Sequence, residues 1–79
     1  MNHENELIAA LSRFSGDPDA QETARKYSRW IQRGIHHAQF TVEFGQTPRD
    51  RENAEVWVKQ AGRVVTILRR WLEKQGVEL

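Results

Sequence analysis

The sequence predicts an all-α fold in which two long antiparallel helices form a hairpin after a short N-terminal helix. Apolar residues recur at alternating steps of three and four along most of the chain, which is the spacing of one helix face. A capping residue followed by proline, Asp17-Pro18 and Thr47-Pro48, stands before each long segment, and this pairing is typical of helix N-termini. The predicted helices cover about residues 4–14, 18–44 and 48–75.

Length and composition indicate a single small helical domain over residues 1–79. The chain has no cysteine, so it forms neither a disulfide nor a thiolate metal site. No apolar run approaches the roughly 20 residues of a membrane span, and the polar start does not resemble a signal peptide, so we expect a cytoplasmic protein. The 12 basic and 11 acidic residues give a net charge of +1, which provides no overall attraction to nucleic acid or to an anionic membrane.

The short N-terminal helix has one apolar face, formed by Leu7, Leu11 and Phe14 and widened by Ile8. Gly16 is expected to end it, because glycine readily adopts the left-handed conformation that closes many helices. A helix of this length is marginal in isolation, so we expect it to pack on the rest of the chain.

The second helix is expected to begin after Asp17 and to run to about residue 44. Its last residues, 40–44, alternate like a β-strand and have strand-type composition. They are too few for a sheet and have no partner strand, so we predict that they stay helical. The predicted inward row is Ala20, Ala24, Tyr27, Ile31, Gly34 or Ile35, Ala38 and Val42.

The third helix has the strongest pattern in the chain, with a wide apolar stripe between a capping residue, Thr47, and a terminating glycine, Gly76. The connection at residues 45–47 is short enough to make it an antiparallel neighbour of the second helix. Small residues then face large ones, and we predict that Gly34 leaves room for Trp57. The stripe comprises Ala54, Trp57, Ala61, Val64, Leu68 and Trp71, flanked by Val58, Val65 and Leu72.

Two helices alone do not enclose a core, and the third helix carries apolar residues beyond its main stripe. The short N-terminal helix is expected to cover part of this flank. A second copy of the chain, completing a helical bundle as a homodimer, would cover the rest, or a different protein would do so. This possible second contact surface consists of Val56, Ile67 and Trp71.

The outer face of the second helix is cationic at one end and aromatic at the other. We predict that it contacts a protein partner with an acidic and apolar surface. In the alternative interpretation the arginines are merely solvated and Phe40 is buried under the N-terminal helix. The predicted partner-binding residues are Arg25, Arg29, Arg33, His36, His37, Phe40 and Phe44.

The sequence carries no pattern expected of a catalytic, cofactor or metal site. His36 and His37 are adjacent and point about 100° apart on a helix, so they do not chelate one metal as an i, i+4 pair would. The serines have no evident base partner for nucleophilic catalysis, and no glycine-rich phosphate loop is present. We therefore predict a protein that is not an enzyme and binds no cofactor.

The predicted function is that of a protein–protein interaction module, such as a small helical adaptor, co-chaperone or inhibitor acting on a larger protein or complex. In size and plan, residues 17–76 resemble the helical-hairpin co-chaperones of type III secretion needle subunits and other short helical modulators encoded by phages and plasmids. The alternative is a nucleic-acid-binding dimeric helical bundle that uses the basic face of the second helix. The near-zero net charge and the many carboxylates oppose this alternative.

Overall fold

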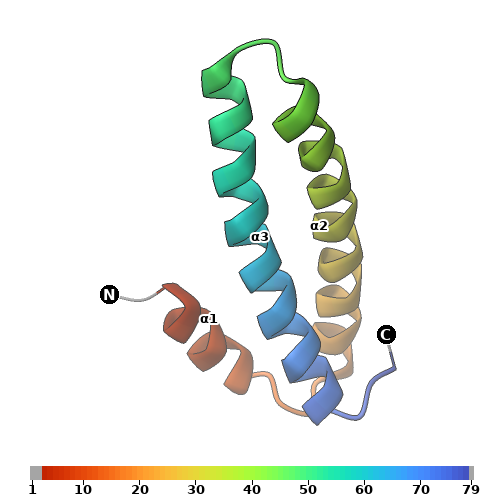
Figure 1. Ribbon diagram of the computed structural model, residues 1–79. Coiled ribbons are helices and arrows are strands. Elements are labelled where there is room, and N and C mark those ends of the chain that lie inside the picture. The colour runs from red at the N-terminus through yellow and green to blue at the C-terminus, as the bar shows by residue number, and fades with distance from the viewer. Residues whose placement is uncertain (1–2, 79) are drawn as a thin grey trace.

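The computed structural model describes residues 3–78 and confirms the predicted fold class, a helical hairpin with a short helix before it (Figure 1). Helices α2 and α3 pack against each other as antiparallel neighbours, and α1 packs on the C-terminal half of α3. The strand-like segment before the hairpin turn is helical, as predicted. α1 spans His3–Ser12, α2 spans Pro18–Phe44 and α3 spans Pro48–Lys74.

Both long helices start at the predicted caps. The carboxylate of Asp17 accepts hydrogen bonds from the backbone N–H groups of Asp19 at 2.9 Å and Ala20 at 3.3 Å. The hydroxyl of Thr47 accepts one from the backbone N–H of Asp50 at 3.1 Å. These bonds satisfy backbone donors that have no partner inside the helix, and the proline after each cap has no N–H to satisfy.

The end of α3 is closed by its own backbone. The N–H of Val77 donates to the carbonyl of Leu72 and the N–H of Gly76 donates to the carbonyl of Glu73, both at 3.0 Å. This pattern is a Schellman motif, which requires a left-handed residue, and Gly76 supplies it with φ of 75°. Gly16 has φ of 79° after α1, as expected for a terminating glycine.

Side chains fix both connections between helices. Gln75, just beyond α3, accepts a hydrogen bond through Oε1 from the backbone N–H of Gly16 at 2.6 Å. At the other end of the hairpin, Nη1 of Arg51 donates to the carbonyl of Gly45 at 2.6 Å. The loop before α2 is therefore held against the C-terminal end of α3, and the hairpin turn is held against the first turns of α3.

The core lies where the N-terminal half of α2 and the C-terminal half of α3, the lower half of the hairpin in Figure 1, meet α1. The predicted inward row of α2 is correct for Ala24, which is buried, but wrong for Tyr27, which is 55% exposed. Ser28 is buried in its place. At about 100° per residue the two positions lie at similar angles on either side of the row, and the small serine fits the close approach of α3. The buried cluster is Ala24, Leu68, Trp71 and Leu72, with Leu11, Ala20, Ile31, Val64 and Val77 packed against it.

The molecule is a thin, elongated layer in which α3 lies between α1 and α2 (Figure 1). Its principal-axis extents are 45 × 29 × 15 Å. The solvent-accessible surface of 6264 Å² is about a quarter larger than the roughly 5,000 Å² typical of a folded monomer of this mass. A layer one helix thick has two wide faces for one small core, so much of its apolar surface stays exposed.

None of the helices within residues 3–78 combines the length and the apolar character needed to cross a bilayer.

Candidate protein-interaction surface

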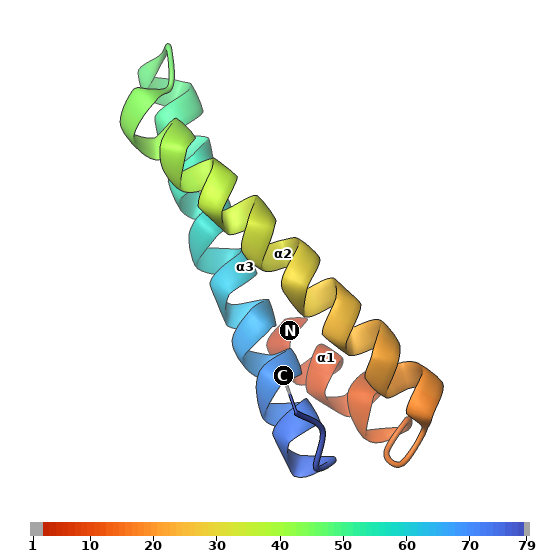
Figure 2. The same cartoon turned by 90° about the vertical axis from the view of Figure 1, so that its right-hand side faces the viewer.

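The side of α2 that faces away from α3 carries a continuous stripe of exposed side chains, here called the outer stripe. Its members follow one another at alternating steps of four and three, which is the spacing of a helix-pairing face. Figure 2 looks onto the α2 side of the hairpin, where no other described helix lies in front of α2. The outer stripe consists of Lys26, Trp30, Arg33, His37, Phe40 and Phe44, all of them exposed.

The C-terminal half of the outer stripe is aromatic. Phe40 and Phe44 lie one turn apart with ring centroids 4.8 Å from each other, and they are 63% and 65% exposed. Trp30, near the other end, is 67% exposed. These three aromatic rings leave a large apolar area in contact with water. Burying that area against a partner would be favourable.

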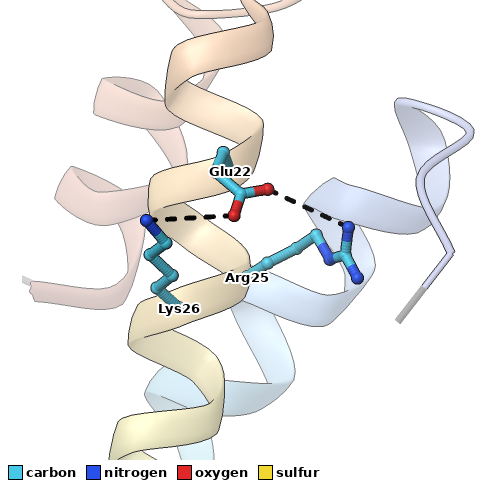
Figure 3. Close-up of polar contacts among 3 residues, drawn as sticks. All are labelled: Glu22, Arg25 and Lys26. Carbon is cyan, nitrogen blue, oxygen red and sulfur yellow. Dashed lines mark ion pairs between the residues drawn. The ribbon is translucent and has the colours of Figure 1, made fainter.

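The N-terminal half of the outer stripe is cationic, and its charges differ in their pairing. Glu22 forms ion pairs with Arg25 at 3.9 Å and with Lys26 at 4.0 Å (Figure 3). Such exposed pairs contribute little to stability. Among residues 3–78, no carboxylate pairs with Arg29 or Arg33. Two guanidinium groups next to Trp30 are therefore available to an acidic partner.

A shallow depression lies on the same part of α2, next to the outer stripe. The sequence analysis missed its two aromatic residues, since Tyr27 was assigned to the core and Trp30 was not considered. Trp30 stands four residues after Lys26 and three before Arg33, so a search for combined cationic and aromatic residues at helical spacing would have found it. The depression is lined by Thr23, Lys26, Tyr27, Arg29, Trp30 and Arg33.

The residues predicted to bind a partner are at the surface of α2, but they do not share one line. Arg25 is partly buried and lies farther from the outer stripe than Arg29, and these two arginines line a depression together with Arg69. The interpretation that α1 buries Phe40 is wrong, because Phe40 is exposed and α1 packs on α3. Arg33, His37, Phe40 and Phe44 belong to the outer stripe, and Arg29 and His36 flank it.

The predicted second surface is largely covered within the chain. Val56 is 54% exposed, but Trp71 is only 8% exposed, and Ile67 lines grooves on both sides of α1. The reason is that the apolar row of α1 docks on this flank. An ion pair between Glu4 and Arg63 at 3.6 Å accompanies the docking.

The upper half of the same hairpin face is not reached by α1. There, Trp57 lies over Gly34 and is 41% exposed, with Val56 beside it on α3. These residues form a smaller apolar surface, here called the upper flank. It is separate from the outer stripe and lies on α3 rather than α2.

Within residues 3–78, no three His, Asp or Glu side chains lie close enough together to hold a metal ion. His36 and His37 are both exposed on α2.

The fold and its surfaces define a small all-α protein built on a helical hairpin. No protein-family model, curated protein or solved structure matches the chain. Its function therefore has to be inferred from the surface itself.

Proposed function

We propose that this chain is a non-enzymatic protein–protein interaction module, a small helical adaptor, co-chaperone or inhibitor that binds through the outer stripe. The balance of large apolar side chains carries this proposal. In the described part of the chain, eight large hydrophobic side chains are at least 41% exposed, whereas four larger than alanine are buried. Three of these eight, Trp30, Phe40 and Phe44, line up on the outer stripe, and exposed apolar side chains that line up on one face mark binding surfaces.

The chemistry of the outer stripe favours a protein as its occupant. Tryptophan and arginine are the residues that most often dominate the binding energy of protein interfaces, and Trp30 lies between Arg29 and Arg33 along α2. The steps of three and four match the ridges that one helix presents to another. A helix that bears carboxylates and apolar side chains would satisfy both halves of the stripe.

Affinity capture from the organism that encodes the chain tests this proposal. Phe40→Ala and Arg29→Glu baits are expected to lose an identified protein that the unchanged bait retains, because the first removes an aromatic contact of the stripe and the second reverses a charge beside it. Both side chains are exposed, so neither change touches the core. Lys59→Glu is the matched control, since it reverses an exposed charge on α3 whose only ion pair among residues 3–78 is with Glu55. Capture that survives both stripe changes would place the binding site elsewhere and contradict the proposal.

A second candidate function, nucleic-acid binding, is favoured by the depression on α2. Its two aromatic residues, Tyr27 and Trp30, stand among Lys26, Arg29 and Arg33, and aromatic rings next to cations form stacking platforms for single-stranded bases. The few cations and the net charge of +1 weigh against this candidate.

The two candidates differ in their dependence on salt. If the depression binds single strands through three cations, the affinity for an oligonucleotide should fall about 10-fold or more between 50 and 200 mM salt. Quenching of Trp30 fluorescence would report the binding, with a Trp30→Phe variant to identify the signal. We expect no saturable quenching, and saturation with that steep salt dependence would favour the second candidate over the first.

A further inference from the structure

We infer that the first occupant of the outer stripe is a second copy of this chain, bound with the two α2 helices antiparallel about a two-fold axis level with residue 35. The inference rests on the proposed function, because it names the partner of the same surface. Its basis is the order of residues within the outer stripe, which suits self-pairing in one orientation.

The positions of the outer stripe are symmetric about residue 35. They are 26, 30, 33, 37, 40 and 44, and their steps of 4-3-4-3-4 read the same in both directions. When two antiparallel copies of α2 are aligned at residue 35, every member of the stripe therefore stands level with another member. Lys26 meets Phe44 of the second copy, Trp30 meets Phe40, and Arg33 meets His37.

The chemistry of these pairs favours the antiparallel orientation. The lysine and the arginine of the stripe stand in its N-terminal half and both phenylalanines in its C-terminal half, so the antiparallel arrangement places the two outer positions of each N-terminal half on a phenylalanine of the second copy. Lys26 then lies against a phenyl ring, which attracts cations through its quadrupole, and Trp30 forms an aromatic pair with Phe40. A parallel arrangement would instead place Lys26 and Arg33 against their own copies.

One flank of the stripe supplies an ion pair in the same register. Arg29 and Glu43 are fourteen residues apart, so they lie about 40° apart on the same side of α2. With a two-fold axis perpendicular to the paired helices, this flank of one copy lies next to the same flank of the other copy. Arg29 is then within about 3 Å along the axis of being level with Glu43 of the second copy. This pairing would partner Arg29, which has no carboxylate partner among residues 3–78.

The surface available on α2 is large enough for such a dimer. The stripe extends over 19 residues, from Lys26 to Phe44, or about 27 Å of helix, and α2 is a free edge of the layer (Figure 2). The surplus of exposed area over a compact monomer exceeds the roughly 500 Å² that each copy must bury in a specific interface. A two-fold dimer is also the commonest closed assembly. The upper flank, with Val56 and Trp57, lies outside this interface.

Sedimentation velocity over a concentration series tests the dimer. The chain is expected to move from 9.3 kDa towards twice that mass as its concentration rises. Trp30→Ala and Phe40→Ala should each weaken dimerisation by about tenfold or more, as central aromatic residues of interfaces do. Val56→Ala truncates an apolar side chain that is 54% exposed and lies outside the stripe, so it should leave the dimerisation constant unchanged. Circular dichroism confirms that each variant is folded.

A charge swap tests the register. Arg29→Glu and Glu43→Arg should each weaken self-association about three- to tenfold, because each replaces two ion pairs per dimer by two repulsions. An equimolar mixture of the two variants should regain the original affinity, because the mixed dimer keeps one pair in its original polarity and restores the other with reversed polarity. Lys59→Glu is the matched control and should behave like the unchanged chain.

Two results would overturn the inference. One is a mass of 9.3 kDa at every concentration. The other is a dimer weakened by Val56→Ala and not by the stripe variants. Neither result alone contradicts the proposed function, which fails separately if capture of an identified protein survives Phe40→Ala and Arg29→Glu. A stripe-dependent dimer without any captured protein would support the inference and contradict the action on a larger partner.

Discussion

Replacing Leu72 with alanine is expected to lower the free energy of unfolding by about 3–4 kcal/mol. Leu72 has a relative exposure of 0%, the lowest of any described residue, and it packs in the cluster with Ala24, Leu68 and Trp71. Truncation removes its apolar burial and leaves a cavity that the surrounding side chains close only in part. The buried cluster has only four members, so the remaining core residues provide little stability to offset the loss.

The expected loss is close to the total free energy of unfolding of a domain of this size. Domains of fewer than about 80 residues derive only about 3–5 kcal/mol from a single core, so Leu72→Ala should be largely unfolded at 37 °C. Thermal unfolding followed by circular dichroism measures it. Ile8→Ala is the control, because Ile8 on α1 is 52% exposed and its loss should change the free energy of unfolding by under about 1 kcal/mol. A melting temperature unchanged by Leu72→Ala would mean that the core lies elsewhere.

The features of the fold that depend on neighbouring residues could be predicted from sequence. Asp17 and Thr47 cap the two long helices, and Gly16 and Gly76 end helices with positive φ. Each of these signals acts within about four residues, so no knowledge of the tertiary structure was needed. The proximity of Gly34 and Trp57 could also be predicted, because a three-residue turn fixes the register of two helices.

The features that depend on the docking of α1 could not be predicted in the same way. Sequence shows that α1 has an apolar face, but not which surface receives that face. Phe40 and Trp71 were both candidates to lie under α1 or to remain exposed. Because α1 docks on α3, Trp71 is buried and Phe40 is exposed. The docking of α1 on α3 therefore covers most of one predicted surface and leaves the other exposed.

The candidate site was only partly predicted because its residues were first grouped by steps of four. Steps of four advance by about 400°, so each step drifts about 40° around the helix. Arg25, Arg29 and Arg33 therefore do not share one line, and Arg25, the farthest of them from the outer stripe, lies partly buried. Alternating steps of three and four cancel the drift. Applied to cationic and aromatic residues together, they yield the outer stripe with Trp30 included.

Replacing Gly34 with leucine is expected to lower the free energy of unfolding by about 1–3 kcal/mol. A Cβ atom at Gly34 would stand 2.8 Å from Cη2 of Trp57, so a larger side chain must push the indole ring off α2. The ring then loses its packing against the α2 backbone, and more of its apolar surface enters water. This loss outweighs the roughly 0.8–1 kcal/mol that replacing a helical glycine gains in helix propensity.

Two further variants separate the steric effect from helix propensity. Gly34→Ala should remain within about 1 kcal/mol of the unchanged chain, because Trp57 is 41% exposed and its ring can tilt outward to admit one methyl group. In a Trp57→Ala background the clash is absent, so Gly34→Leu should become neutral or stabilising by up to about 0.8 kcal/mol. Chemical denaturation of the four variants in a double-mutant cycle measures this coupling. If Gly34→Leu destabilised both backgrounds equally, the close contact between Gly34 and Trp57 would not be what joins the upper halves of α2 and α3.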